Sequence, residues 1–443
     1  MKELIALLDG REVGVVRQDR NRLSFAYLDS WRTSRGAYPL SLSMPLAAKE
    51  HPHSAIEPFL WGLLPDNEFI LARWAQRYQV SPRNPFALLL HVGEDCAGAV
   101  QFAAPDRVAE VTGPAASEID WIDEAEIATR LRALREDASA WRQPRDPGRF
   151  SLAGAQPKTA FLFDGARWGV PAGRAPTTHI LKPPTNGFDG HAENEHLCMA
   201  LARSLGMPAA QSEVKRFGDE IAIVVERYDR VRDGGGTRRL HQEDICQALG
   251  VHPSRKYQND GGPGPREITS LLRANASTAR PSTVNTSAVN VVPGAQSRMN
   301  AEIDIQTFLD ALIFNWLIGG TDAHAKNYSV LIGAGGLVRL APLYDIASIL
   351  PYDDIDPSKA RLAMKIGDEY GLHHVGVNEW RKLAAATKID AEAVIDRIRN
   401  MTAELPDLLA AEVARAQAEG LNNPLIGRLQ ARLSARAAKL AAI

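Results

Sequence analysis

Short apolar runs separated by turn residues occupy the first hundred positions of the chain. Each run is long enough for one strand, and turn signals such as Asp9-Gly10 lie between them, which is typical of strands joined by hairpins. A helical period interrupts the runs over 56–79. We therefore expect a β-rich opening module with one helix. Its predicted strands cover 6–8, 13–16, 23–28 and 100–103.

The pattern changes to mixed helices and strands after two breaks. A Pro/Ala/Gly-rich stretch covers 104–117, and a second break with two prolines and a glycine covers 143–148. Asp164-Gly165 between two apolar runs is a strong hairpin signal. The sequence therefore predicts an α+β region that ends near Tyr228. Its elements are helices over 123–136 and 193–205 and strands over 158–163, 167–170, 178–182 and 221–226.

Helical periodicity dominates the chain after Arg230. The clearest helix covers 305–317, where apolar residues recur at spacings of three and four, and Gly319-Gly320 follows it as a stop signal. We expect its apolar face to be buried. The segment 275–297 is rich in Ser, Thr, Asn and Pro and has no acidic residue, so we predict a mobile loop there.

Basic residues recur along one face of the last predicted helix, which follows Pro424. They are Arg428, Arg432, Arg436 and Lys439. A solvated surface face is the simpler interpretation of such a stripe. A surface that binds nucleic acid or a partner protein is the alternative.

The composition is that of an ordinary globular protein. The chain has 443 residues, 45% of them hydrophobic and 23% charged, and 51 Lys+Arg against 53 Asp+Glu leave a net charge of -2. This near balance argues against a surface coated for nucleic acid. At roughly 150 residues per domain, two or three domains are expected. The breaks in the pattern place them at 1–110, 111–230 and 231–443.

Cysteine usage and hydropathy predict a protein of the cytoplasm. The three cysteines are far apart and show no C-x-x-C spacing, so neither a disulfide scaffold nor a cysteine zinc site is indicated. The first apolar run, 5–8, is soon broken by charged residues, and no stretch approaches the roughly 18 apolar residues of a membrane span. We therefore expect no signal peptide and no membrane partner. The cysteines are Cys96, Cys198 and Cys246.

The strongest chemical signal lies in 319–327, between the buried helix and a predicted strand. Asp322 is followed five positions later by Asn327, which is the spacing of a kinase catalytic loop, where the aspartate orients the attacking hydroxyl and the asparagine holds a metal ion. A predicted hairpin with strands 328–332 and 337–340 leads to a second aspartate, Asp345, which stands where a kinase places its metal-binding aspartate. Isolated aspartates often only cap helices or turns. The order of all three residues favours phosphoryl transfer.

Upstream residues could supply the other parts of a phosphoryl-transfer site. Lys182 ends a predicted strand, where a kinase lysine reaches nucleotide phosphates, and either Glu195 or Glu193 of the next helix could position it. The small residues within 151–158 would let main-chain amides approach phosphates, although an ordinary loop is an alternative. The apolar strand ends at 226–228, where the two lobes of a kinase join and an adenine edge could meet the main chain. A capped strand end is an equally good interpretation.

These segments resemble the successive signature segments of the HipA-type toxin kinases, and they occur in the family's order. The resemblance runs from about residue 40 to about residue 350, and Pro157 departs from it by replacing an expected acidic residue. The opening module resembles the family's through 42–46, 63–67 and 95–100. The later segments are Ser-Leu-Ala-Gly-Ala-Gln-Pro-Lys-Thr at 151–159, Thr-Thr-His-Ile-Leu-Lys at 177–182, Val-Glu-Arg-Tyr-Asp-Arg at 225–230, His-Gln-Glu-Asp at 241–244, Lys256-Tyr257, Gly-Gly-Pro-Gly at 261–264, 321–327 and Tyr344-Asp345.

The resemblance implies a two-lobed, protein-kinase-like α+β fold with a β-rich opening module and a helical C-terminal lobe. It also implies a serine/threonine protein kinase that uses ATP and Mg²⁺. Asp322 would be the catalytic base, Asn327 and Asp345 would bind Mg²⁺, and Lys182 would contact ATP. Further nucleotide contacts would come from Ala153, Gly154, Ala155, Gln156, Pro157, Lys158, Glu226, Arg227, Tyr228, His324, Ala325, Lys326, Asn327, Tyr344 and Asp345.

Partners and regulation are implied in the same way. The kinase would be the toxin of a toxin-antitoxin pair, its partner a HipB-like helix-turn-helix antitoxin, and operator DNA would be bound through their complex. Its substrate would be an aminoacyl-tRNA synthetase. Ser151 would be an autophosphorylation site, whereas the residues alone equally allow a turn serine whose hydroxyl caps a local amide.

The residues alone leave two other functions open. A small-molecule kinase would use the same parts, because those parts do not specify the acceptor. A non-catalytic co-repressor subunit would hold DNA with its basic C-terminal stripe. It would have no need, however, of Asp322, Asn327, Asp345 and Lys182 together.

Overall fold

The computed structural model describes residues 2–113, 119–143, 145–185, 187–232, 236–275 and 295–441. An antiparallel five-stranded sheet opens the chain, and Asp9 and Gly10 both adopt a positive φ at its first hairpin turn, as two-residue turns of this kind require. The predicted strand 100–103 is confirmed, 23–28 agrees to within one residue, and 6–8 and 13–16 lie within strands that are longer than predicted. The sheet order is β4 (Glu50–His51), β3 (Arg22–Tyr27), β2 (Arg11–Asp19), β1 (Lys2–Leu8) and β5 (Val100–Ala103).

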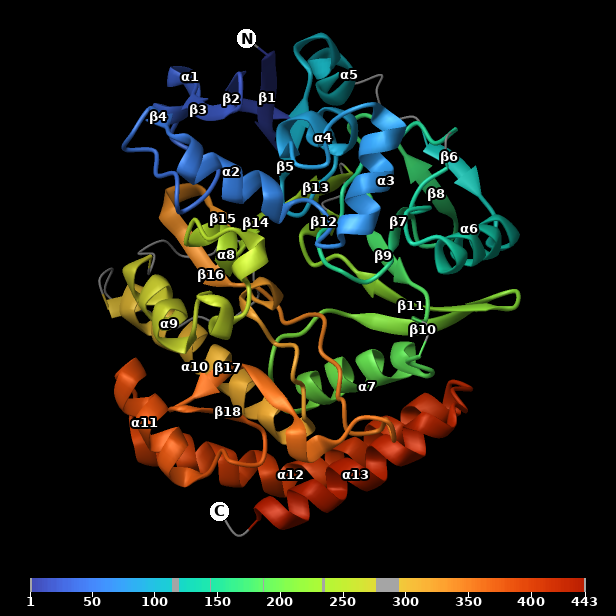
Figure 1. Cartoon of the computed structure of the whole chain (residues 1–443), viewed down its shortest axis with the longest axis vertical. Coiled ribbons are helices and arrows are strands. Elements are labelled where there is room, and N and C mark those ends of the chain that lie inside the picture. Colours follow the sequence, from blue (N-terminus) through green and yellow to red (C-terminus); the bar gives the residue numbers. More distant parts are fainter. Residues whose placement is uncertain are drawn as a thin grey trace.

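Helices of this first module lie beside the sheet in Figure 1. The predicted single helix over 56–79 is wrong, because a turn at 63–67 divides it. Pro65 has no N–H to donate within a helix, and the Asn67 side chain caps the next helix by accepting from the N–H groups of Phe69 and Ile70. The helices are α1 (Asp29–Arg32), α2 (His53–Gly62), α3 (Glu68–Tyr78), α4 (Pro85–Val92) and α5 (Val108–Thr112).

A six-stranded antiparallel sheet forms the next part of the chain. It contains the predicted hairpin, whose turn residue Asp164 accepts hydrogen bonds from the N–H groups of Ala166 and Arg167. All four predicted strands are confirmed to within one residue at each end. The sheet order is β10 (Ser212–Phe217), β11 (Glu220–Glu226), β9 (His179–Lys182), β7 (Thr159–Phe163), β8 (Trp168–Pro171) and β6 (Ile119–Ile122).

Both faces of this sheet are covered, which explains the nearly unbroken apolar run of β11. Successive side chains of a strand point to opposite faces. Val224 therefore packs in the core that contains Ile127 of α6 (Glu124–Glu136), whereas Ile223 packs in the core that contains Leu197 of α7 (His191–Ser204). The predicted helices 123–136 and 193–205 are these two, and no end is shifted by more than two residues.

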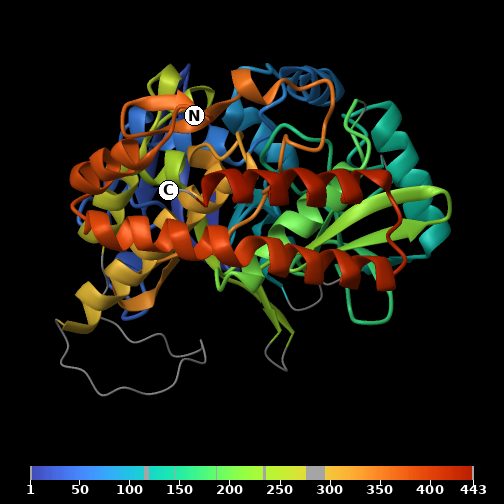
Figure 2. The same cartoon turned by 90° about the horizontal axis from the view of Figure 1, so that it is seen from below.

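The largest core lies in the helical part of the chain, which fills the lower half of Figure 1. Figure 2 shows its two long C-terminal helices running beside each other across one end. The helices of this part are α8 (Ile245–Ala248), α9 (Pro265–Ala274), α10 (Ala295–Ile318), α11 (Val377–Thr387), α12 (Ala391–Ala418) and α13 (Pro424–Leu440).

The helix α10 contains the predicted segment 305–317, and its apolar face is buried as expected. Gly319 ends it with φ +68°, and an added Cβ would lie 2.8 Å from Leu350 Cγ, so this position requires glycine. The predicted loop 275–297 falls mainly outside the described residues. Its last three positions already belong to α10.

Small sheets accompany the helices. The predicted hairpin after the 319–327 segment is confirmed as β15 (Ser329–Gly333) and β16 (Leu337–Leu340), and β14 (His241–Asp244) pairs with β15. Two further hairpins are β12 (Arg230–Arg232) with β13 (Thr237–Arg239), and β17 (Arg361–Ile366) with β18 (Glu369–Gly371).

The basic stripe of α13 belongs to the interior contacts of the protein. Arg428 donates to Pro351 O at 3.0 Å and Arg432 to Leu350 O at 2.6 Å. Arg436 is buried and donates to the last carbonyls of α10, at Trp316 and Leu317, 3.0 Å each. Helix C-termini favour such cations because their final carbonyls lack partners. The interpretation as a solvated surface face is therefore wrong for Arg436, whereas Arg428 and Arg432 are half-buried and Lys439 is exposed.

Candidate functional site

Lys182 connects the two halves of the candidate site. It ends β9, is buried, and its Nζ lies 2.7 Å from both Glu195 Oε1 of α7 and Asp345 Oδ1. Positions two apart on a helix face different directions, so only one of Glu193 and Glu195 can meet the lysine, and it is Glu195. Burial alone would lower the pKa of Lys182, but Asp345 and Glu195 raise it above its ordinary value. The lysine is therefore charged at neutral pH.

Asp345 lies in an unusual backbone conformation. Its φ is +59°, in the left-handed region that costs a residue other than glycine free energy and is enriched at functional sites. Its side chain is 37% exposed although it pairs with Lys182. Burial would raise the pKa of this carboxyl, but Lys182 and Lys158 outweigh that effect and hold it well below the ordinary value. The result is a fixed carboxylate with accessible oxygen, which suits a cation.

The segment after α10 closes into a compact loop. Asn327 Nδ2 donates to Asp322 O at 2.9 Å, so the amide Oδ1 is the atom left for a cation. Asp322 is exposed, and its carboxylate accepts a hydrogen bond from the hydroxyl of Tyr257. Burial lowers the pKa of His324, while Asp322 and Asp345 both favour its charged form. The two aspartates, 23 positions apart in sequence, therefore both act on the charge of this histidine.

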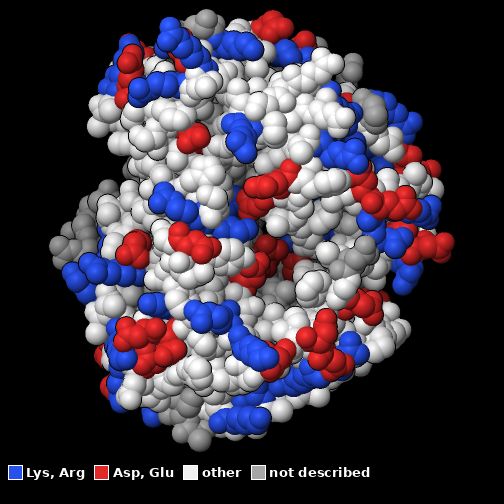
Figure 3. All heavy atoms as spheres, viewed as in Figure 1, with Lys and Arg blue, Asp and Glu red and all other residues white. Residues whose placement is uncertain are grey.

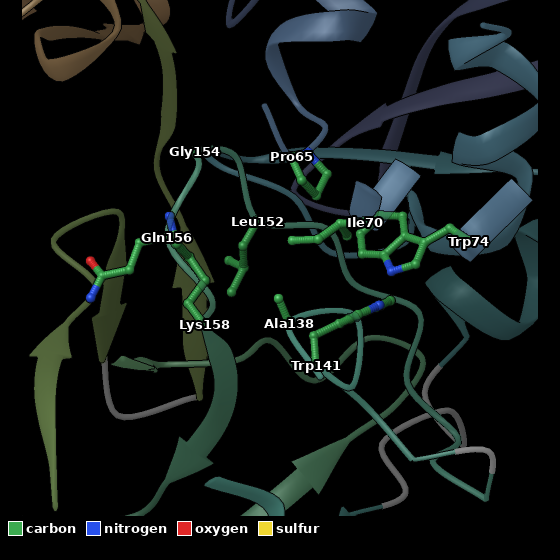
Figure 4. Close-up of a pocket in the computed structure, with 9 residues that line it drawn as sticks. All are labelled: Pro65, Ile70, Trp74, Ala138, Trp141, Leu152, Gly154, Gln156 and Lys158. Atoms are coloured by element: carbon green, nitrogen blue, oxygen red, sulfur yellow. The ribbon is translucent and has the colours of Figure 1, made fainter. Parts of the chain in front are cut away.

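The loop 152–158 leads into β7, the strand that pairs with β9, which Lys182 ends. Gly154 has φ +104°, and Lys158 Nζ donates to Ala153 O at 2.7 Å, which folds the loop back on itself. Burial and the neighbouring Lys182 lower the pKa of Lys158 to about 8. Figure 4 shows Gly154, Gln156 and Lys158 along the loop. A partly open pocket beside the loop is lined by Pro65, Ile70, Trp74, Ala138, Trp141, Leu152, Gly154, Gln156 and Lys158.

The segment 226–228 divides into different roles. Glu226 is exposed at the end of β11, and the hydroxyl of half-buried Tyr228 is hydrogen bonded to Gln242. The guanidinium of Arg227 is instead taken up by Asp229 and by Cys96 O of the first module, at 3.0 and 2.7 Å. The side chain of Arg227 therefore links the end of β11 to the first module.

Tyr344, Ala325 and Lys326 are also placed by internal contacts. Tyr344 donates its hydroxyl to Lys326 O at 2.8 Å, its ring lies 5.9 Å from that of Tyr228, and Ala325 is buried in the short 3₁₀ helix Ala325–Asn327. The ammonium of Lys326 lies 3.0 Å from Asp66 Oδ1. The structure thus brings the sequence-predicted residues of 152–158, 182, 322–327 and 345 to one region. Figure 3 shows a hollow near the middle of one face of the molecule, with acidic side chains at its rim.

Sequence reasoning assigned no role to several residues that contact this site. Tyr257 bonds to Asp322, and Asp66 bonds to Lys326 and Lys256. The available signal was their place in the segments 63–67 and 256–257, which resemble those of the HipA-type kinases. A short sequence segment does not show which distant residues it contacts, however, and these contacts join residues that are 65 to 260 positions apart in the sequence.

The described residues contain no metal cluster of the usual all-protein kind. Within those ranges no group of three or more His, Cys, Asp or Glu side chains is arranged to hold a metal ion. In the same ranges, no helix combines the length and apolar character needed to cross a membrane.

Two family models match the chain. The HipA N-terminal domain matches residues 4–103, and the HipA-like C-terminal domain matches residues 150–409, which is more than half of the chain. The chain belongs to the HipA family. The resemblance seen in the sequence is therefore confirmed, whereas the domain boundaries after residues 110 and 230 stay predictions.

Relatives of this HipA-family protein cover nearly its full length. A putative kinase, Y4mE, of Sinorhizobium fredii is 38% identical over 410 residues, which are 92% of this chain and 90% of that protein. The serine/threonine-protein kinase toxin HipA of Shewanella oneidensis is 30% identical over 404 residues, which are 90% of this chain and 86% of that protein.

A solved structure supports the same assignment. A chain in the complex of HipA, HipB and operator DNA from Shewanella oneidensis matches with a TM-score of 0.79 and 25% identity, covering 99% of this chain and 98% of that one. The predicted two-lobed, protein-kinase-like α+β fold is confirmed. The small sheets β14–β16 and β17–β18 lie within its otherwise helical lobe.

Proposed function

We propose that this HipA-family protein is an ATP-dependent serine/threonine protein kinase that acts as the toxin of a toxin-antitoxin pair. The bridge from Lys182 to Glu195 and Asp345, facing the Asp322 to Asn327 loop, carries this proposal. A kinase requires a positioned lysine for the phosphates, an acidic metal ligand and a base for the acceptor hydroxyl. The kinase names of its relatives support the same class.

The residues present suit ATP with Mg²⁺. Mg²⁺ takes oxygen ligands and is commonly held by one or two carboxylates together with substrate phosphates, and the oxygens here would be those of Asp345 and Asn327. Bound Mg²⁺ would offset the charge of the phosphate oxygens. Lys182 now donates to Asp345. Nucleotide phosphates would compete for this ammonium, which would leave the Asp345 oxygen for the cation.

Asp322 would act on the acceptor hydroxyl. Its carboxylate is exposed, so a serine or threonine side chain on another protein can approach it. Its bond from Tyr257 holds one oxygen, and the other can accept the hydroxyl proton. This exposure favours a protein acceptor over a small molecule. An aminoacyl-tRNA synthetase, as the family resemblance implies, is the substrate that we propose.

Removing the Asp345 carboxylate tests the site. Asp345→Ala should lose magnesium-dependent affinity for ATP, because the main cation ligand is absent. Calorimetric titration of ATP into the wild type and the variant, each with Mg²⁺ and with a chelator, separates this loss from a general effect on nucleotide binding. With chelator the two proteins should differ little. Equal affinities in the presence of Mg²⁺ would contradict the assignment of Asp345.

Ser151 is the residue at which we propose autophosphorylation. It is fully buried, and its Oγ donates to Leu63 O at 2.7 Å, so it does not cap a local amide. A phosphate at this point would add nearly two negative charges and three acceptor oxygens. A buried position beside nucleotide phosphates cannot hold that charge, so the modified loop 152–158 would move outward and ATP affinity would fall.

Two variants test this regulation. Ser151→Asp should weaken ATP binding at least about tenfold, which corresponds to about 1.4 kcal/mol, whereas Ser151→Ala should bind ATP almost normally. After incubation with ATP, mass spectrometry should find phosphate on Ser151 of the wild type and none in Asp322→Asn. Labelling of other serines without Ser151, or normal ATP binding by Ser151→Asp, would rule the switch out.

A HipB-like helix-turn-helix antitoxin is the partner that we propose. Support comes from the solved HipA relative, which is in complex with HipB and its operator DNA. The net charge of -2 leaves this chain little electrostatic drive toward DNA, since phosphate contacts by Lys and Arg supply most non-specific affinity. Operator DNA would therefore be bound through the complex, with the antitoxin reading the bases, and the pair would act in the cytoplasm.

A further inference from the structure

The turn between α2 and α3 in the first module touches the phosphate-facing loop through its main chain. Asp66 N donates to Gly154 O at 3.1 Å, Pro65 forms a parallel bridge with Gly154, and Leu63 O accepts from Ser151 at 2.7 Å. Figure 4 shows Pro65 beside Gly154. The turn that broke the predicted long helix is therefore in direct contact with the loop 152–158.

The side chain of Asp66 makes different contacts from the same turn. Its Oδ2 lies 2.8 Å from Lys256 Nζ and its Oδ1 lies 3.0 Å from Lys326 Nζ, and only 11% of the side chain is exposed. Burial alone would raise the pKa of Asp66, but Lys326 and Lys256 lower it to about 2. One carboxylate thus bridges two ammonium groups that come from separate segments of the helical lobe.

Both lysines are directly connected to the loop that carries Asp322. Lys326 belongs to that loop and precedes Asn327. Lys256 O accepts a hydrogen bond from Ala325 N at 3.2 Å, and the next residue, Tyr257, donates its hydroxyl to the Asp322 carboxylate. The Asp66 carboxylate therefore acts on two sides of the catalytic loop, once through Lys326 and once through Lys256 and Tyr257.

A second acid competes for Lys326. Asp244 Oδ2, at the end of β14, lies 3.8 Å from Lys326 Nζ, and burial raises the pKa of Asp244 to about 6. If the charge of Asp66 were lost, Asp244 would be the remaining carboxylate near this ammonium. Lys326 would then be drawn toward β14 and away from the 63–67 turn. The loop that carries Asp322 and Lys326 would shift relative to the loop 152–158.

We propose that Asp66 is a positioning residue for phosphoryl transfer. It holds the catalytic loop and Tyr257 in a fixed position relative to the loop that faces the nucleotide phosphates. This inference rests on the proposed kinase function. It makes the first module part of the active site. The main chain of the 63–67 turn contacts the loop that faces the nucleotide phosphates, and the carboxylate of Asp66 in the same turn positions the loop that carries Asp322.

The inference predicts a change in turnover rather than in nucleotide binding. Asp66→Asn keeps the shape and the main-chain bonds to Gly154, so the KM for ATP should change less than about threefold, whereas kcat should fall about 10- to 100-fold, as misplacement of reacting groups by about 1 Å does. Asp66→Glu keeps the charge and should recover part of kcat. Phosphate transfer to protein is measured at saturating Mg²⁺.

Asp310→Asn is a matched control. Asp310 on α10 is 12% exposed and pairs with Arg397 of α12 at 2.9 Å, away from both loops. Its substitution removes a comparable ion pair and should leave kcat and KM near the wild-type values. Thermal melts of both variants show whether any loss of activity follows a loss of folded protein.

A second variant tests the inference in case Asp66→Asn folds poorly. Lys256→Gln removes one arm of the bridge and should lower kcat by itself, and the double variant with Asp66→Asn should be little slower than Asp66→Asn, because the two residues act as a unit. Equal kcat for Asp66→Asn and Asp310→Asn, or additive losses in the double variant, would overturn the inference. If the wild type transfers no phosphate, the proposed function itself fails.

Discussion

Asp322→Asn should bind ATP and Mg²⁺ normally and transfer phosphate about 100- to 10,000-fold more slowly, which is the usual contribution of a general base. Asp322 is exposed and contacts neither Lys182 nor Asp345, and an asparagine oxygen can still accept the hydroxyl of Tyr257. The loop should therefore keep its shape while it loses the group that takes the proton. Calorimetry gives the affinity, and transfer of labelled phosphate to protein gives the rate.

Asp356→Asn is the matched control for this substitution. Asp356 is an exposed aspartate of the same lobe whose carboxylate caps Ser358 N at 2.9 Å, and nothing connects it to the candidate site. It should retain the wild-type rate. Transfer by Asp322→Asn at that same rate would show that Asp322 is not the base.

The second large effect is expected on stability, from Asp95→Ala. Asp95 of the first module is buried, and its carboxylate lies 2.9 Å from Arg230 Nη2, 3.1 Å from Arg239 Nε and 2.9 Å from Thr177 N. Removing one partner of a buried ion pair leaves uncompensated charge and typically costs about 3–5 kcal/mol. The free energy of unfolding, measured from urea midpoints at unchanged slope, should fall by that order.

The pH dependence of this loss is also determined by the contacts. Burial would raise the pKa of Asp95, but Arg230 and Arg239 hold it well below the ordinary value. A carboxyl with a lowered folded-state pKa stabilises the protein above its unfolded-state pKa, and this stabilisation is lost as the pH falls below about 4. The difference between the wild type and Asp95→Ala should therefore shrink in acid.

An exposed ion pair in the same module is the control. Asp29 pairs with Lys49 at 2.6 Å on the surface, and surface pairs contribute little to stability. Asp29→Ala should leave the urea midpoint nearly unchanged. If Asp95→Ala shifted the midpoint no more than Asp29→Ala, the buried network around Asp95 would not be what joins the first module to the strand end at Arg227.

Local sequence signals predicted the elements well where one rule dominated. The apolar spacing of α10, the Asp164-Gly165 turn and the apolar run of β11 were all confirmed, because each depends on neighbours only a few residues away. The same rule failed over 56–79. Apolar residues continue through that segment at helical spacing, but Pro65 and the Asn67 cap interrupt the backbone hydrogen bonds.

Candidate chemistry could be predicted only where the residue type and its spacing were both distinctive. Asp322, Asn327 and Asp345 share a spacing and order with one class of reaction, so they could be proposed as candidates before the fold was known. Asp66 and Tyr257 are common residues in short segments, and nothing within those segments indicates that they bond to Lys326 and Asp322.

By itself, the sequence indicated the family, the order of most elements and the residues that we propose for the chemistry, because hydrophobic period, turn residues and motif spacing are properties of neighbouring positions. The tertiary structure alone decided which partner each charged side chain takes. In the folded protein, Lys182 pairs with Glu195 and not with Glu193, and the arginines of α13 donate hydrogen bonds to main-chain carbonyls. Those choices depend on distances between residues far apart in the chain, and such distances exist only after the core has packed.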